Sequence, residues 1–554
     1  MASISRRTFL KASMLGVAGA AVANAPMVMG TLARQSEPVD VMIVGSGFGG
    51  AVAALRLGEQ GYHTVLLERG KRWPITEEQN TFSSLQNPDG RSAWLSETSL
   101  LGYPRPIDRY TGVLEIVLGN GIAALAGSGV GGGSLIYAGA LLQPTEEMFH
   151  RIFRDSVDYG EMDSVYYPKV NQVIRARKLT NKLRLRPEYA GVKEWLKLGK
   201  GAGLDAELIS LGVHWGKVRR ELKGKLLRSV VSGDFWYGNN SGAKDTLDTN
   251  YLSMAEARGY LEILPQQNVT SIEQGPDGRY LVSVDEIDTN GMVERKRQFV
   301  VRKLFLAAGS MGTSRLLVNA RGQGLLPNLD DYVGMGWGNN GDFFSDISGF
   351  SSGINPNLGG PVTGIVRDFD NPIAPVVVEC YANWALEGQG GTISTIGMSI
   401  SPPKGYFSYD PELGDSVLNW PTQDPQVQQV IEAGSLTYER LLGSEEGRGK
   451  RATALKSGFY QSRLPRDGLL GVDSTSSMRA QRHSPIVTSV TAHPLGGVVL
   501  GQATDNLGMI NNHEGLYAID GSLIPGHTGC ANPALTIAAL AERNIEKIIQ
   551  RDFN

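Results

Sequence analysis

The sequence has little cysteine and no large excess of either charge. Its two cysteines, Cys380 and Cys530, form no CxxC pair, which excludes a zinc ribbon or a thioredoxin-like site. We expect two buried free thiols rather than a disulfide. Lys and Arg total 53 against 56 for Asp and Glu, so the formal net charge of −3 gives no overall basic field. The sequence therefore predicts neither a metal centre nor a nucleic-acid partner.

Glycine, by contrast, is in excess. There are 70 glycines in 554 residues, nearly double an average usage of about 7%. They follow no Gly-X-Y period, and 41% hydrophobic with 20% charged residues excludes a disordered chain. A chain of this length can bury a large core. The extra glycines therefore need a local explanation.

The N-terminus reads as an export address. Residues 5–11 are SRRTFLK, which resembles a twin-arginine signal, and an Ala/Gly-rich, weakly apolar stretch follows. We expect residues 1–33 to be a signal peptide cleaved within residues 23–33, and the mature protein to be periplasmic or secreted. A permanent membrane anchor is the alternative, but Asn24 and Pro26 interrupt the apolar stretch.

A dinucleotide-binding pattern follows this segment. Residues 39–44 (VDVMIV) predict a buried strand, and GSGFGG begins at Gly45. Gly45 allows the tight turn, Gly47 lets backbone approach a pyrophosphate, and Gly50 packs helix on strand. The next predicted strand ends in Glu68, which can accept hydrogen bonds from ribose hydroxyls. Strand, helix, second strand and acid together indicate a Rossmann-like cradle.

Later segments favour FAD over NAD. The sequence after the second strand, Glu68-Arg69-Gly70, resembles FAD-binding folds. Residues 304–310 predict another buried strand running into a helix. Residues 516–522 predict a strand ending in Asp520, a carboxylate able to accept hydrogen bonds from a ribityl chain. The cofactor domain is thus expected to be assembled from segments spread along the whole chain.

Two further motifs carry chemistry. Residues 127–134 (GSGVGGGS) lie between apolar segments, which favours close backbone approach to a flat ligand over a flexible linker. Near the C-terminus, His493 and Asn532 precede an apolar-faced helix. A lone histidine is more often structural. Oxidation of an alcohol by a flavin, however, needs a proton acceptor and a polar group to hold the substrate oxygen.

On these motifs the chain resembles the glucose–methanol–choline (GMC) oxidoreductases and, within them, the cholesterol oxidases that hold FAD non-covalently. The likeness runs from Val41 to the C-terminal helix and is strongest in residues 127–135, 237–240, 304–340 and 493–548. It implies an α/β fold (α+β overall): a Rossmann-like FAD-binding domain interleaved with a substrate domain built on an antiparallel sheet with helices. The expected FAD-binding segments are residues 36–159, 236–344 and 481–554, with a lid at 80–110, and the expected substrate-domain segments are 160–235 and 345–480.

The resemblance also implies roles for three catalytic residues. His493 corresponds to the histidine that positions or deprotonates the 3-hydroxyl, and Asn532 to its partner at the substrate oxygen and flavin edge. Glu379 corresponds to the carboxylate that moves a proton in steroid isomerisation. The residues themselves support this last role, because Glu379 shares a face with Val377 and Tyr381 in a strand-like run. An acid on an apolar face is either paired or functional.

The resemblance and the glycine motifs together give a set of cofactor contacts. Val269 is expected at the adenine, Glu68 at the ribose, Gly133 at the pyrophosphate and Gly521 at the flavin. The full expected set is Gly45, Gly47, Phe48, Gly49, Gly50, Glu68, Gly131, Gly132, Gly133, Ser134, Tyr137, Ala138, Val269, Asp520, Gly521, Asn532 and Ala534.

The chain departs from the cholesterol oxidase pattern at three places. Tyr137-Ala138 stands where that pattern has Asn-Gly, and Ala492 and Ala534 each replace an aromatic residue. These changes enlarge or reshape the substrate pocket. They leave FAD and alcohol oxidation in place but extend the expected substrate from cholesterol to a related sterol or another bulky secondary alcohol.

The expected activity is an exported oxidase: hydride passes from a sterol 3-hydroxyl carbon to FAD, O2 is reduced to H2O2, and the 5-ene isomerises to the 4-ene. Two alternatives stay open, a dehydrogenase passing electrons to a quinone or cytochrome and a non-redox lyase. Residues 80–110 are expected to form either a packed lid or a mobile lid that transiently touches a membrane surface. The sequence does not give the oligomeric state; a monomer is the working expectation.

Overall fold

The computed structural model describes residues 37–99, 101, 105–383, 388–453 and 487–553, which belong to one compact unit. The predicted signal peptide and residues 454–480 of the predicted substrate domain lie outside the described residues. Within the described residues, no helix combines the length and apolar character needed to cross a bilayer. Cys380 and Cys530 are both buried and free, as predicted.

The first sheet has seven strands in the order β8-β2-β1-β11-β10-β9, with β20 paired to β11. Its strands are β1 (Glu37–Val44), β2 (Thr64–Leu67), β8 (Leu261–Leu264), β9 (Gln267–Gln274), β10 (Tyr280–Ile287), β11 (Val293–Leu306) and β20 (Leu516–Ala518). β1 pairs in parallel with β2 and with the second half of β11, whereas the first half of β11 runs antiparallel to β10. The predicted strands at 39–44, 64–68, 304–310 and 516–522 therefore meet in one sheet.

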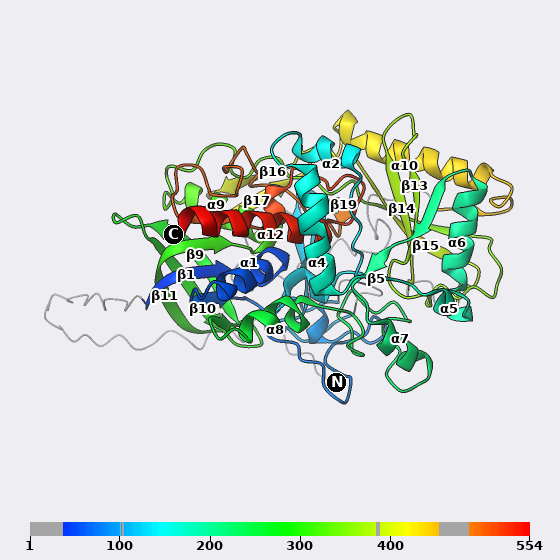
Figure 1. Cartoon of the computed structure of the whole chain (residues 1–554), viewed down its shortest axis with the longest axis horizontal. Coiled ribbons are helices and arrows are strands. Elements are labelled where there is room, and N and C mark those ends of the chain that lie inside the picture. Colours follow the sequence, from blue (N-terminus) through cyan, green and yellow to red (C-terminus); the bar gives the residue numbers. More distant parts are fainter. Residues whose placement is uncertain (1–36, 100, 102–104, 384–387, 454–486, 554) are drawn as a thin grey trace, which may run out of the picture. The chain divides into compact units, whose positions relative to one another are not determined.

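Two helices from opposite ends of the chain pack together on this sheet. α1 (Phe48–Glu59) follows β1 directly, and its small residues Ala51, Ala53 and Ala54 are fully buried. Small side chains allow close approach, and α12 (Pro533–Asp552) lies against α1 (Figure 1). The buried Glu542 of α12 accepts hydrogen bonds from Arg56 of α1 at 2.6 and 2.7 Å. The C-terminal helix is therefore an integral part of the cofactor domain.

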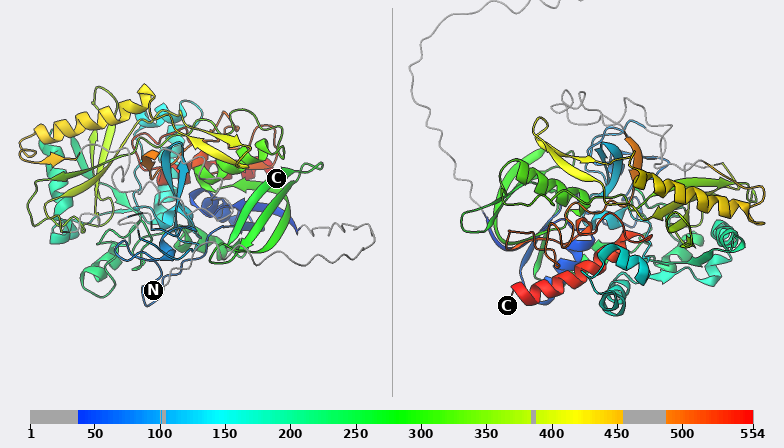
Figure 2. Two further views of the ribbon diagram at one scale, coloured as in Figure 1. Left: turned by 180° about the vertical axis from the view of Figure 1, so that it is seen from behind. Right: turned by 90° about the horizontal axis from the view of Figure 1, so that it is seen from above.

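A second, antiparallel sheet has six strands in the order β18-β12-β15-β14-β13-β6. Its strands are β6 (Asp205–Leu208), β12 (Phe343–Ser348), β13 (Gly364–Asp368), β14 (Val376–Tyr381), β15 (Ile393–Ser399) and β18 (Arg451–Ala452). α6 (Ala190–Gly201) and α10 (Pro425–Gly443) pack against it (Figures 1 and 2). Every residue of β14 is buried, because the helices cover one face and a cavity wall forms on the other.

The register of this sheet decides which side chains reach the cavity. Ile396 of β15 lies opposite both Phe344 of β12 and Glu379 of β14. Residues directly opposite one another point to the same face. Phe344, Ile396 and Glu379 therefore form one row, and all three line the cavity.

The remaining elements connect and cover the two sheets. β19 (Val487–Thr491), β4 (Gly121–Gly127) and β3 (Leu114–Gly119) form a small third sheet in that order, and two further pairs are β16–β17 (Tyr406–Asp410, Asp415–Asn419) and β5–β7 (Arg177–Lys178, Ser210–Leu211). The other α-helices described are α2 (Glu146–Phe153), α3 (Tyr159–Glu161), α4 (Tyr167–Ile174), α5 (Asn181–Arg184), α7 (Trp215–Leu222), α8 (Tyr251–Glu256) and α9 (Gly309–Gly322).

The buried apolar side chains form two main clusters that do not follow the predicted segments in every detail. One cluster surrounds the first sheet, and the other lies between the second sheet and its helices. Met162, Tyr167 and Val170 belong to the first cluster, although residues 160–235 were assigned to the substrate domain. The reason is that α4 packs against α12, a contact between distant segments. The boundary expected at 344 also shifts, since β12 begins at Phe343.

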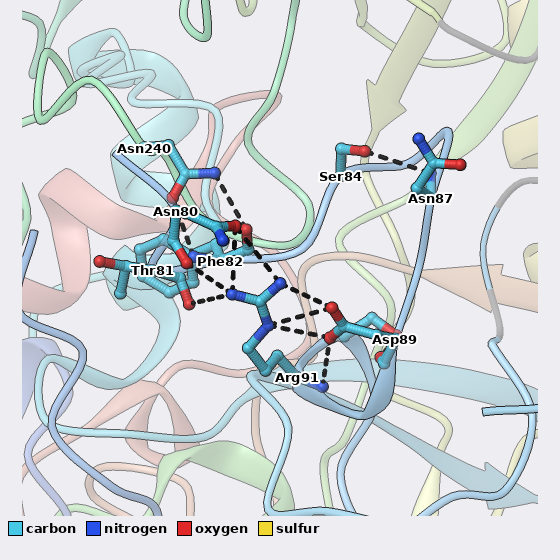
Figure 3. A network of polar contacts seen from close by, with 9 residues as sticks. Asn80, Thr81, Phe82, Ser84, Asn87, Asp89, Arg91 and Asn240 are labelled. Atoms are coloured by element: carbon cyan, nitrogen blue, oxygen red, sulfur yellow. Dashed lines mark hydrogen bonds and ion pairs between the residues drawn. The ribbon is translucent and has the colours of Figure 1, made fainter. Parts of the chain in front are cut away.

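A polar network holds residues 80–110, the segment expected to act as a lid. Figure 3 shows Arg91 at its centre. The Arg91 guanidinium donates to both carboxylate oxygens of Asp89, at 2.6 to 3.1 Å, and to the backbone carbonyls of Asn80 and Thr81. Charge-assisted bonds of this kind are the stronger class of hydrogen bond. One side chain thus ties both ends of residues 80–91 together.

The apolar side chains of this segment point inward. Phe82 stacks on Trp73 with ring centroids 5.2 Å apart. The backbone N–H of Phe82 donates to the side-chain oxygen of Asn240 at 2.8 Å, and the Asn240 side-chain nitrogen donates to the Phe82 carbonyl at 3.0 Å. Trp94 and Leu95 line the central cavity. Among the described residues of 80–110, no large apolar side chain is exposed. The structure therefore favours the packed lid over one that presents apolar side chains to lipid.

Candidate active site

One cavity of about 930 Å³ runs between the two sheets. Three helices begin at its wall: α1 after Gly47, α9 after Ala308 and α12 after Asn532, and none of these N-terminal residues caps its helix with a side chain. The first N–H groups of a helix lack internal partners and carry partial positive charge. The cavity wall therefore offers backbone donors suited to a phosphate or to another electron-rich group.

The glycines of the cradle are required by close backbone contacts. Gly45 has φ of +101°, and a Cβ on Gly49 would lie 1.8 Å from the carbonyl oxygen of Ile519. A Cβ on Gly132, in the second glycine loop, would lie 2.6 Å from the Cα of Gly47. The two glycine segments thus pack backbone against backbone, which explains why the 127–134 run is no flexible linker.

Glu68 and Asp520, the two expected ribose and ribityl acceptors, are largely engaged by protein donors. Glu68 accepts from the N–H groups of Ser46, Gly70 and Gly129 and from the Ser46 hydroxyl, the last at 2.6 Å. Since a carboxylate accepts about four hydrogen bonds, a bound ribose has to displace the Ser46 hydroxyl or share its acceptor. Asp520 accepts three, from the N–H groups of Gly309 and Ser522 and from a threonine hydroxyl, so one acceptor position stays open.

His493 lies at the other part of the cavity, where a buried carboxylate orients it. Its Nδ1 lies 2.8 Å from Oδ1 of Asp342, whose side chain is fully buried. The other oxygen of Asp342 accepts from the Thr491 hydroxyl at 2.7 Å and from the N–H of Ala492 at 3.0 Å. Because a carboxylate only accepts, Nδ1 carries the proton and Nε2 is the basic nitrogen.

The pKa of His493 follows from two opposing effects. Burial lowers the pKa of the imidazole, but the negative charge and hydrogen bond of Asp342 outweigh burial and raise it above its ordinary value. The Glu379 carboxylate acts in the same upward direction. His493 is therefore a stronger base than a free histidine, which suits it to take a proton from a hydroxyl.

Glu379 and Asn532 form a pair beside this histidine. The Asn532 side-chain nitrogen donates to Oε2 of Glu379 at 3.0 Å, while Oε1 of Glu379 and the carbonyl oxygen of Asn532 have no protein partner. Both residues are buried and both line the cavity. Burial raises the pKa of Glu379 to about 7. Two unpartnered polar oxygens in a largely apolar wall indicate a site for a polar group of a ligand.

The wall around this polar group is aromatic and aliphatic. Its residues come from the second sheet, from the residue pair that precedes β13 and from the loop that follows α7: Phe344, Tyr381, Ile396, Val362, Phe235 and Trp236. Ala492 and Ala534, the positions that lack an aromatic residue, also line the cavity. The arrangement suits a large apolar molecule with one polar group directed at His493 and Asn532.

The structure brings most predicted site residues to this cavity. All three predicted catalytic residues line it, as do fourteen of the seventeen predicted cofactor contacts. Gly50, Gly131 and Ser134 do not line it. Gly50 packs against the carbonyl of Gly45, and Ser134 shapes the loop by bonding the carbonyl of Gly131 at 2.7 Å. These contacts shape the cradle, and a direct contact of the three residues with a cofactor stays a prediction.

Two functional candidates escaped sequence analysis. Asp342 lies 151 residues before His493, so only the fold reveals the pair. Lys244 is fully buried and donates to the carbonyls of Leu135, Tyr137 and Phe235 at 2.6 to 3.3 Å. Burial lowers its pKa to about 7. Its local signal was weak, because a lysine beside Asp245 reads as an ordinary surface pair.

Comparison with known proteins agrees with this architecture. Residues 39–328 and 418–541 match the N- and C-terminal family models of the GMC oxidoreductases. A cholesterol oxidase of Mycobacterium tuberculosis is 28% identical over 91% of this chain and 90% of its own length. One of Acinetobacter baumannii is 23% identical over 92% and 94%.

Solved structures show the same fold at lower identity. A pyridoxine 4-oxidase from Mesorbium loti superimposes with a TM-score of 0.61 at 16% identity, covering 93% of this chain and 99% of that one. A formate oxidase of Aspergillus oryzae, studied for FAD modification, gives 0.60 at 13% identity, covering 94% and 99%. At such identities the likeness concerns the fold alone.

Proposed function

Since the chain belongs to the GMC oxidoreductase family, we propose that it is an exported FAD-dependent oxidase. Its substrate is a sterol 3-hydroxyl or a similarly bulky secondary alcohol. It also isomerises the 5-ene product to the 4-ene. The observation that carries the proposal is a single cavity with a glycine cradle in one part and His493, Asn532 and Glu379 in another. The cholesterol oxidases similar over most of the chain support the substrate class.

The residues present fit FAD. The uncapped start of α1 and the glycine loop would hold the pyrophosphate, Glu68 and Val269 the adenosine, and the start of α12 the flavin edge. Held there non-covalently, FAD would supply the hydride acceptor for an alcohol carbon and the route by which the electrons reach O2 as H2O2. A Cβ at Gly49 would overlap the Ile519 carbonyl, so the cradle tolerates little change.

The first task of the protein side chains is to remove the hydroxyl proton. Nε2 of His493 is the acceptor, because Asp342 holds the proton on Nδ1 and fixes the ring. The carbonyl oxygen of Asn532, which has no protein partner, lies beside the same cavity and supplies a second polar contact for the alcohol, whose single hydroxyl proton goes to Nε2. Together they orient the alcohol before the carbon is oxidised.

The second task is isomerisation. Oxidation makes the carbon between the new ketone and the 5,6 double bond acidic. Glu379, with a pKa of about 7, takes a proton from that carbon and returns it to the far end of the alkene. The Asn532 N–H stays on Oε2, which leaves Oε1 free for the transfer. A group whose pKa lies near neutral pH both accepts and donates efficiently.

Export completes the proposal. The twin-arginine motif of residues 5–11 would carry the folded, cofactor-loaded chain across a membrane. Replacing Arg6 and Arg7 by lysine should retain the protein, uncleaved, in the cytoplasm. Normal export of that variant would contradict this part of the proposal.

A substrate panel on the purified, flavin-loaded protein tests the activity. We expect H2O2 in amounts equal to the sterol consumed, with little from short-chain alcohols, and a 4-en-3-one as product. Turnover with a quinone but without H2O2 would favour a dehydrogenase. Turnover without any flavin reduction would favour a lyase. The variant His493→Ala should lose the reaction while keeping bound flavin.

A further inference from the structure

Helix α7 and the turn that follows it carry a dense group of cationic side chains. Residues 217–228 read KVRRELKGKLLR, with six Lys or Arg in twelve positions. Five of the six are exposed: Arg219, Arg220, Lys223, Lys225 and Arg228. This segment, the α7 basic surface, lies at the lower edge of the ribbon in Figure 1 and in the left view of Figure 2.

These charges are mostly unneutralised. Of the five, Arg228 alone has a carboxylate near it among the described residues, Glu188 at 3.7 Å. The acid within the segment, Glu221, is turned inward and fully buried, where it accepts the N–H groups of Ser229, Val230 and Val231. The helix therefore separates its charges, with its carboxylate in the core and its cations in solvent. The carboxylates of Glu77 and Glu78, exposed on the neighbouring turn, offset only part of the positive charge of these five side chains.

Apolar side chains lie within the same surface. Leu227 is 49% exposed, and its N–H donates to the side chain of Gln79 at 2.7 Å, which holds the 75–79 turn beside it. Ile75 on that turn is 39% exposed and lies close to Gly242, whose carbonyl accepts from Lys217. Exposed leucine and isoleucine among lysines and arginines are typical of a surface that settles into a lipid headgroup layer.

The basic surface is also close in sequence to the cavity wall. Trp236, which lines the cavity, is eight residues after Arg228, so the two lie within about 28 Å even for a fully extended chain. Between them, the Glu221 carboxylate anchors the backbone of residues 229–231. A surface held on a lipid layer by α7 thus has a short, rigid connection to the apolar substrate site.

We infer that the α7 basic surface binds the anionic face of a lipid membrane, from which the apolar substrate is taken. This rests on the proposed function for its purpose, but the binding itself does not depend on turnover. The protein as a whole carries a net charge of −3, so attraction to an anionic membrane has to come from a local surface of opposite sign. Among the described residues of the lid, no large apolar side chain is exposed beside such charges.

Vesicle co-sedimentation of the flavin-loaded mature protein tests the inference. Vesicles of phosphatidylcholine are compared with vesicles that also contain phosphatidylglycerol. Binding should require phosphatidylglycerol and fall steeply with added salt. Equal binding to both kinds of vesicle, or binding to neither, would overturn the inference.

Paired variants locate the surface. Lys223→Gln with Lys225→Gln should weaken partitioning by about thirtyfold, from about 1 kcal/mol for each lysine near an anionic surface. The matched control is Lys193→Gln with Lys197→Gln on α6, which removes the same charge from exposed positions elsewhere. Equal loss in both pairs would show a non-specific charge effect and refute the assignment.

Two further readouts separate the possible explanations. Duplex DNA is added as a competitor to the protein bound on vesicles. If DNA displaces the vesicles at the concentration at which it binds the protein alone, the surface is a general polyanion site and the lipid assignment is overturned. Oxidation of a detergent-solubilised substrate should be unchanged in the α7 variants. A protein that binds anionic vesicles yet oxidises no alcohol would refute the proposed function and leave the surface intact.

Discussion

Replacing Asp342 by asparagine is the change that probes the histidine most sharply. The carboxylate has three donors around it: Nδ1 of His493, the Thr491 hydroxyl and the N–H of Ala492. An asparagine has only one acceptor oxygen. If that oxygen stays on the imidazole, its NH2 group meets the N–H of Ala492, two donors with no acceptor between them. If the amide flips, its NH2 donates to Nδ1 and forces the proton onto Nε2.

Either arrangement damages proton removal, and the size follows from the contacts. A hydrogen bond to a charged group is worth about 1.5 to 3 kcal/mol, which corresponds to about 10- to 150-fold in the rate of substrate oxidation. The negative charge is also lost, and an opposite charge at this distance shifts a pKa by about one to three units. Because Asp342 raises the pKa of His493, the variant should have a lower one.

The pH profile gives the sign. His493 acts as a base only when neutral, so activity rises as pH rises through its pKa. In Asp342→Asn the maximal rate of oxidation, reached at high pH, should fall. The pH range over which the rate rises to that maximum, the acid limb of the profile, should move to lower pH. Anaerobic stopped-flow measurement of the first oxidation, across a pH series, records both effects. Nitrogen-15 labelling of histidine offers a direct view of the tautomer, since the chain has only seven histidines.

Asp415→Asn is the matched control. It removes a carboxylate from the same cavity wall, but Asp415 contacts Arg315 and Asn319 rather than the histidine. Its acid limb should stay in place. Equal flavin content and equal thermal unfolding are required of both variants before rates are compared. An Asp342→Asn profile that keeps the wild-type limb and plateau would refute the orienting role.

Three other changes follow from the same geometry. Glu379→Gln should keep alcohol oxidation but accumulate the 5-en-3-one. The variant should also need more denaturant to unfold than wild type above pH 7, but not below pH 4.5. The Glu379 carboxyl ionises near pH 4.5 in the unfolded chain but only at about 7 in the folded one. The folded wild type therefore loses up to about 3 kcal/mol of stability as pH rises between these values, and glutamine removes that loss. Gly49→Ala should yield protein without flavin absorbance, since its Cβ would lie 1.8 Å from the Ile519 carbonyl oxygen; a normal flavin content would contradict the cradle. Ala534→Phe should raise KM for a sterol more than for a small secondary alcohol, because the side chain fills cavity space; an equal change for both would place the substrate elsewhere.

Local sequence pattern was sufficient for the cofactor cradle. The β1–α1–β2 unit is continuous in sequence, and each of its glycines is dictated by its own turn or nearest neighbour. The prediction that strands near residues 304 and 516 join this unit was confirmed, because buried parallel strands carry a recognisable apolar run. Glu379 was also placed correctly, since alternation along β14 fixed its face.

What sequence could not give is contact between distant segments. Asp342 follows a glycine and asparagine run that predicts only a turn, and its importance depends on the start of β12 lying against the end of β19. Likewise α4 has an ordinary amphipathic pattern, so its packing against α12 and its place in the cluster around the first sheet could not be inferred. The α7 basic surface was missed because the chain's overall net charge is negative.

The central claim, that this cavity oxidises a bulky secondary alcohol at a bound flavin, is tested most directly by adding a 3β-hydroxy-5-ene sterol to the flavin-loaded protein without oxygen. The account predicts that the visible band of the oxidised flavin disappears, and that admitting air restores it with one H2O2 formed for each ketone. A band that persists while the sterol is bound would contradict the account.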